Sequence, residues 1–194
     1  MQTGRLEAFS DGVLAIIITI MVLELKVPEG ARLSALQPLW PIFLSHVLSY
    51  LYLGIYWTNH HHLFQAARRV NGRILWANLH LLFWLSLVPF VTGWMGKNRF
   101  AALPVAMYGV VLLAAAVAYF MLSQAIISHQ GNESVLSQAL GKDLKGKLSM
   151  GIYVIAILLA FASPWVACVL YGLVAAIWFI PDRRIEKVLS RDDK

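Results

Sequence analysis

The side chains of this sequence that can do chemistry are few, and they lie in or beside long apolar segments. Asp11 stands about one turn inside the first segment, where an ionisable group costs up to roughly 3 kcal/mol to insert into a bilayer. Such acids usually face the protein interior and have partners. At the same predicted depth lie Ser10, the run His60-His61-His62, Asn78 and His80. We expect a hydrogen-bonded cluster, which either packs helices together or serves as a proton or ion site.

Bulk composition places most of this chain in lipid rather than in water. Of the 194 residues, 59% are hydrophobic and 13% are charged, and the mean hydropathy is +0.67. Soluble domains are about one-quarter charged. The net charge of +6 is typical of a membrane protein with basic cytoplasmic loops, so we expect the lipid bilayer as a partner and no nucleic acid. The single cysteine, Cys168, excludes an internal disulfide.

The apolar runs predict an all-α, polytopic fold with a single transmembrane domain over 1–194. A spanning helix needs about 20 mostly apolar residues. The last run, 148–180, is too long for one span, and Ser163-Pro164 divides it because proline disfavours helical geometry in the residue before it. The six predicted helices are 7–25, 39–59, 74–94, 101–127, 148–162 and 165–180, followed by a basic cytoplasmic tail, 181–194.

The distribution of basic residues predicts the orientation. With six spans, 12 of the 16 lysines and arginines lie on the side that holds both termini. With five spans, the two sides would carry 7 and 9. Because basic residues are enriched in cytoplasmic loops, the count favours six spans. We therefore expect a multi-pass protein of the cell membrane with both termini in the cytoplasm.

A stripe of large apolar side chains runs along the first helix. Ile16, Ile20 and Leu23 follow an i, i+4, i+7 spacing, which places them on one narrow face. Asp11 lies about 140° away from Ile16 on the helical wheel. If Asp11 packs against the second and third helices, the stripe faces either lipid or copies of itself in an oligomer.

Several segments of the first 90 residues form a recognisable pattern. The first helix carries Arg5-x-x-x-Phe9-Ser10-Asp11 followed by Gly-Val-Leu-Ala-Ile, and the second ends in Tyr-Trp-Thr-Asn-His-His-His-Leu-Phe at 56–64. Asn78 and Ser-Leu-Val-Pro-Phe at 86–90 complete the pattern. It resembles the signature of the transmembrane-protein-175 potassium channels, which include the endosomal and lysosomal channel of animals and its single-repeat bacterial relatives.

The resemblance implies a potassium-permeable cation channel rather than an enzyme, with no cofactor and K⁺ as the permeant ion. It also implies a homotetramer in which the first helix of each copy lines a central pore. Ile16, Ile20 and Leu23 would form the constriction, and Thr19 would contribute to selectivity. Glu24 either places negative charge at the outer mouth or is an ordinary interface residue.

The resemblance further assigns a structural role to the motif. Arg5, Ser10 and Asp11 would hold the first helix through hydrogen bonds to the second and third helices, and Phe9 belongs to the same motif. The implied partners of these side chains are His61, His62 and Asn78.

An apolar ring of this kind can gate by dewetting. It excludes water when narrow and passes a partly hydrated cation when wider. The sequence contains no TVGYG-type carbonyl filter. We therefore expect only modest selectivity for K⁺ over Na⁺.

Two other functions compete with the channel. A membrane di-iron enzyme needs several spaced histidine boxes, but three consecutive residues on a helix point about 100° apart, and the remaining histidines are isolated. We expect no metal site. A proton-coupled secondary transporter that uses Asp11 and the nearby histidines is the alternative, although no repeat or broken midplane helix is evident.

Overall fold

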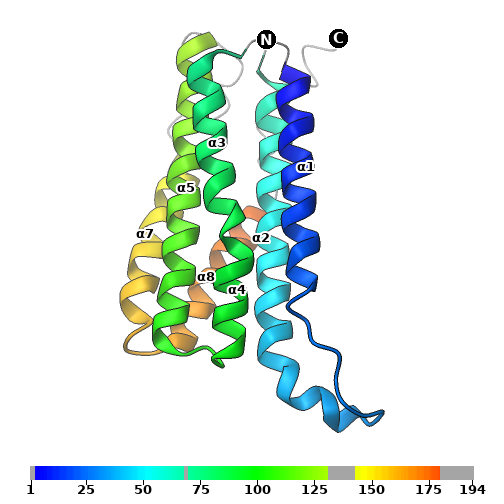
Figure 1. Cartoon of the computed structure of the whole chain (residues 1–194). Helices are drawn as coiled ribbons and strands as arrows, with labels where there is room; N and C mark the ends of the chain where they lie inside the picture. The colour runs from blue at the N-terminus through cyan, green and yellow to red at the C-terminus, as the bar shows by residue number, and fades with distance from the viewer. Residues whose placement is uncertain (1–2, 68–69, 131–142, 180–194) are drawn as a thin grey trace.

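The computed structural model describes residues 3–67, 70–130 and 143–179, and every regular element among them is a helix (Figure 1). One short 3-10 helix, η1, precedes α2, and the others are α-helices. The bounds are α1 Thr3–Val22, η1 Leu33–Leu39, α2 Trp40–Gln65, α3 Gly72–Ser86, α4 Val88–Lys97, α5 Ala102–Gln130, α7 Leu144–Leu159 and α8 Pro164–Phe179.

Three regions of the described chain are long and apolar enough to cross a membrane: Leu33–Gln65, α3 together with α4, and α5. The apolar helix α8 is shorter, with 16 residues. The 20-residue α1 carries Arg5, Glu7 and Asp11, and the first turn of α7 carries two lysines. An all-helical membrane bundle follows from the three long regions, whereas a count of six crossings also needs α1, α7 and α8.

The second helix is longer than its apolar run. α2 continues past the predicted end at residue 59 and reaches Gln65. Asn59 and His60 are buried there, and both are hydrogen-bonded: Asn59 Nδ2 donates to the Ile55 carbonyl, and His60 pairs with Asn78. Polar partners inside the bundle stabilise the helix beyond the point where hydropathy alone would end it.

The third predicted helix is divided into α3 and α4 at Leu87. Pro89 has no N–H to donate to the Leu85 carbonyl, and helices break or kink at such positions. The helical bonds resume where the Val91 N–H donates to the Leu87 carbonyl over 3.2 Å. α4 then runs to Lys97, beyond the predicted end at residue 94, and packs against α2, α5 and α1.

The last two helices form a hairpin at Ser163-Pro164. α8 begins at Pro164, where the missing N–H of proline is harmless because first-turn N–H groups have no helical partner. Figure 1 shows α7 and α8 beside only the lower part of α5, so the hairpin is shorter than the bundle. The predicted tail, 181–194, lies outside the described residues.

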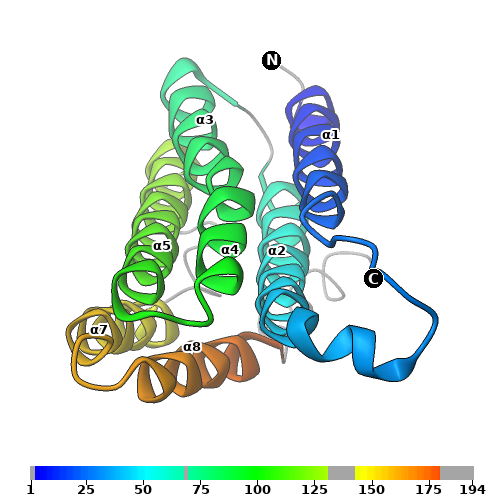
Figure 2. The ribbon, with the colours of Figure 1, turned by 60° about the horizontal axis from the view of Figure 1, so that its bottom comes forward.

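The helix α5 is central in the bundle, and α1 lies at its edge. α5 packs against α3, α4, α7 and α8, whereas α1 packs against α2, α3 and α4 (Figure 2). Small residues permit close approach to α5: Ala115 and Ala118 are fully buried, and a Cβ on Gly109 would overlap the Tyr171 hydroxyl. α1 is therefore packed on one side, and its other side is open.

Candidate ion pathway along α1

The two faces of α1 differ in burial. One face is packed against the bundle and consists of Leu6, Ser10, Leu14, Ile17 and Met21. The opposite face carries the predicted stripe, in which Ile16 is 59% exposed, Ile20 46% and Leu23 80%. The structure thus separates the stripe from the packed face, as the helical wheel predicts. In this single chain no neighbouring helix covers the stripe among the described residues.

A buried polar chain fastens the packed face of α1 to α3 and α2. Asn78 Nδ2 donates to Ser10 Oγ over 2.9 Å, and Ser10 Oγ donates to the Leu6 carbonyl over 2.9 Å. Because the Asn78 amide nitrogen is used in this way, its Oδ1 accepts from His60 Nε2, 2.8 Å away. Ser10, Asn78 and His60 are essentially inaccessible to solvent. The chain therefore joins three helices by directional bonds in an apolar interior.

A second set of contacts joins α1 to α2 near the same end. Trp57 Nε1 donates to Asp11 Oδ1 over 3.0 Å. One turn away, His61 Nδ1 lies 2.5 Å from Glu7 Oε1, while Gln65 Nε2 donates to His61 Nε2 over 2.8 Å. Glu7 and Asp11 are four residues apart, and so are Trp57 and His61, so the two contacts form adjacent rungs between the helices.

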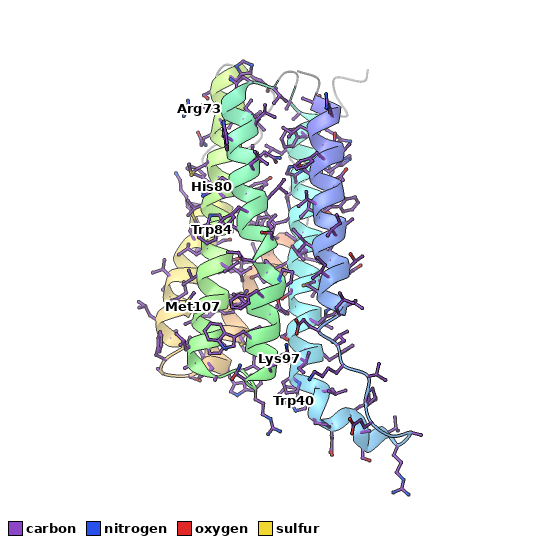
Figure 3. The ribbon with its side chains drawn as sticks, in the orientation of Figure 1. Trp40, Arg73, His80, Trp84, Lys97 and Met107 are labelled. Atoms are coloured by element: carbon purple, nitrogen blue, oxygen red, sulfur yellow. The ribbon has the colours of Figure 1, made fainter. Side chains whose placement is uncertain are left out.

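The residues of the predicted cluster therefore belong to separate sets of contacts rather than to one network. His60, rather than His61 or His62, binds Asn78, and the Nδ1 atom of His62 has no partner among the described residues. His80 instead accepts from Trp84 Nε1 on its own helix, and Figure 3 labels both residues on α3. Sequence reasoning missed Glu7 on α1 and Trp57 on α2, whose spacings of four from Asp11 and His61 could have indicated them.

Two motif residues lie on the exposed face of α1. Phe9 is 52% exposed, and it lies on the same side of the helix as Ile16. Arg5 is also exposed, and within the described part of the chain it has neither a hydrogen bond nor an ion pair. Its predicted contact to the second and third helices therefore has no counterpart among the residues that the structure describes.

The residue predicted to contribute to selectivity, Thr19, is exposed beside the stripe. Its hydroxyl donates to the Ile16 carbonyl over 2.9 Å. Because the proton points back to the helix, the oxygen lone pairs remain available on the exposed face.

At the far end of α1, Glu24 is ion-paired. Its Oε2 lies 2.5 Å from the ammonium of Lys97, the last residue of α4. No group of three or more His, Cys, Asp or Glu side chains within the described ranges is arranged to hold a metal ion.

The fold and these contacts define a class: a helical membrane protein whose edge helix is fastened by a polar motif and exposes an apolar stripe. A protein-family model described as "Endosomal/lysosomal potassium channel TMEM175" matches residues 5–89, which contain the motif. A relative from Chryseobacterium sp. (strain P1-3), named as a potassium channel, is 56% identical over 192 residues, covering 99% of this chain and 100% of its own. The chain therefore belongs to the TMEM175 family, a family of ion channels rather than enzymes, as the motif resemblance predicted.

Two further comparisons define the extent of the likeness. The crystal structure of a lysosomal potassium-selective channel TMEM175 homolog from Chamaesiphon minutus has a TM-score of 0.82 and 30% identity, covering 93% of this chain and 97% of that chain. A human relative, named "Endosomal/lysosomal proton channel TMEM175", is 34% identical over 83 residues, which are 37% of this chain and 16% of the relative.

Proposed function

We propose that this protein is a potassium channel whose central pore is lined by α1 from several copies of the chain, four in the simplest arrangement. The observation that carries the proposal is the exposure of Ile16, Ile20 and Leu23 on a helix whose opposite face is packed. The potassium-channel names of the Chryseobacterium relative and the Chamaesiphon structure support K⁺ as the permeant ion. One copy has a single α1 and cannot enclose a pore with it, so the function requires an oligomer.

In this proposal Ile16, Ile20 and Leu23 form successive apolar rings. The stripe covers seven residue steps, or about 10 Å along the helix axis. Such rings exclude water when narrow and admit a partly hydrated cation when wider. Thr19 presents hydroxyl oxygen beside them, and oxygen is the ligand type that replaces the hydration shell of K⁺. No cofactor takes part in permeation.

The proposal includes six crossings with the start of α1 on the cytoplasmic side of the cell membrane. In Figure 1, α1 begins, α2 ends, α3 begins and α5 ends at the same end of the bundle. This alternation supports one crossing each for α1, α2, α3 with α4, and α5, and in the proposal α7 and α8 add the fifth and sixth. The excess of basic residues on the side of both termini supports the orientation.

A proton-coupled transporter is the second candidate. The observation that favours it is a pair of buried imidazole nitrogens, Nδ1 of His60 and of His62, that have no partner within the described residues. The name of the human relative, a proton channel, also favours proton movement through this family.

A flux assay in liposomes separates the two candidates. The purified protein is reconstituted with a K⁺ gradient, and K⁺ release is followed with and without an imposed pH gradient. We expect a K⁺ leak that follows the membrane voltage and needs no proton gradient. Flux that requires a pH gradient would overturn the channel in favour of the transporter. A monomeric mass for the active, detergent-solubilised protein would overturn the shared pore.

A further inference from the structure

The end of α1 opposite the motif carries a neutralised acid. The Glu24 carboxylate follows the last turn of α1 and is paired with the Lys97 ammonium over 2.5 Å. Both side chains are partly exposed, and Figure 3 shows Lys97 at the end of α4 beside the segment that follows α1. The pair therefore lies at the surface of the bundle rather than in its core.

The absence of a side chain at one position of α4 leaves room for the Glu24 carboxylate. Gly93 faces Glu24, and a Cβ at this glycine would lie 3.0 Å from Glu24 Oε2 and 3.1 Å from its Cδ. With hydrogen in place of Cβ, the carboxylate packs directly against α4, one helical turn from Lys97. Both the position and the partner of Glu24 are thus set by α4.

The position of Glu24 gives the pair an electrostatic consequence. Glu24 directly follows Leu23, so it lies at one edge of the exposed stripe. An unpaired carboxylate at this edge would attract cations. A carboxylate in contact with an ammonium acts as a dipole, and its attraction for a distant cation is small.

We propose that Lys97 sets the cation conductance of the channel by cancelling the charge of Glu24 at the outer end of the pore. This inference rests on the proposed function, in which α1 lines the pore. The ion pair thus leaves the pore entrance close to neutral, and removal of one partner converts it into a charged ring. Lys97 acts through Glu24 and through the local potential, without contact with the permeant ion.

The magnitude follows from Coulomb's law with screening. In a tetramer, Lys97→Gln leaves four uncompensated carboxylates around one entrance. At about 10 mM salt the Debye length is about 30 Å, and four charges ~10 Å from the axis raise the local K⁺ concentration about sevenfold. At about 1 M salt the Debye length is about 3 Å and the enrichment vanishes.

The test is single-channel conductance at low and high KCl for Lys97→Gln, Glu24→Gln and the double variant. We expect Lys97→Gln to raise the conductance about sevenfold at ~10 mM and to leave it unchanged at about 1 M. Glu24→Gln leaves the ammonium alone and should lower the conductance at ~10 mM by a similar factor. The double variant removes both charges and should return the conductance close to the wild-type value.

Arg99→Gln is the matched control, because Arg99 lies two residues beyond Lys97 and has no ion pair within the described residues. It removes one positive charge from the same end without freeing a carboxylate, so its effect measures the part of the change that net charge alone causes, and the effect of Lys97→Gln should be larger. Equal effects of the two variants, or a double variant that stays at the single-variant value, would overturn the inference. If Ile16→Asn changes the conductance and Lys97→Gln does not, only this inference fails. If neither variant changes the conductance, the proposal that α1 lines the pore fails as well.

Discussion

The most informative stability prediction concerns Asn78, the middle member of the buried polar chain. Asn78→Ala removes two hydrogen bonds between helices, to Ser10 Oγ at 2.9 Å and to His60 Nε2 at 2.8 Å. Hydrogen bonds between membrane helices are worth about 0.6 kcal/mol on average and up to about 1.7 kcal/mol. We therefore expect a loss of about 1–3 kcal/mol and a fall in unfolding temperature on the order of 5 °C.

The assay is thermal unfolding in detergent, followed by the fraction of protein that keeps its elution volume on size-exclusion chromatography after heating. Asn98→Ala is the control, since the Asn98 amide donates only to the Trp94 carbonyl and is exposed. A double variant with Ser10→Ala tests the coupling: once Asn78 is gone, the further loss should be smaller than in the wild-type background. If Asn78→Ala unfolds at the same temperature as Asn98→Ala, the buried chain does not stabilise the bundle.

Three further predictions concern permeation, assembly and packing. Ile16→Asn should hydrate the apolar ring, raise cation leak several-fold in liposome flux and reduce selectivity; unchanged flux would remove this residue from the constriction. Asp11→Ala should reduce the yield of assembled protein on size-exclusion chromatography, because Trp57 loses its acceptor; a well-assembled variant with only altered permeation would contradict a structural role. Gly109→Ala should lower the free energy of unfolding by about 1–3 kcal/mol, because the added methyl group meets the Tyr171 side chain. Gly151→Ala, where a Cβ meets nothing within 4 Å, should leave the unfolding temperature unchanged or slightly raised, because alanine has the higher helix propensity.

The apolar stripe on α1 could be predicted because helical periodicity is a local property. The spacing of Ile16, Ile20 and Leu23 determines their shared face, whatever the rest of the chain does. The presence of Asp11 inside an apolar run likewise predicts a polar partner on another helix. The family follows from the same segment, because the motif residues are close together in sequence.

The choice of partners could not be predicted, because it depends on how α2 is rotated against its neighbours. His60 and His61 are about 100° apart on the helix, so one faces α3 and the other faces α1. From sequence spacing alone, the two histidines are equivalent candidates for the hydrogen-bond partner of Asn78. Helix ends were missed for a related reason: hydropathy ends α2 before its histidines, although His60 and His61 bind α3 and α1 through hydrogen bonds.

The role of Arg5 stays a prediction. Its side chain lies on the same face of α1 as Ile16 and Phe9, away from the packed side. In the proposed oligomer this face meets other copies of the chain. A contact of Arg5 would then be formed between subunits, which no single-chain periodicity can reveal.

The order of donors in the buried chain also limits proton transfer along it. His60 donates to Asn78, Asn78 donates to Ser10, and Ser10 donates to the Leu6 carbonyl. A proton relay needs each member to accept on one side and release on the other, whereas an amide side chain and a backbone carbonyl do not exchange protons readily. The hydrogen-bonded chain therefore does not transfer protons between the imidazole of His60 and the rest of α1. The buried chain can thus hold α1 without opening a path for protons through it.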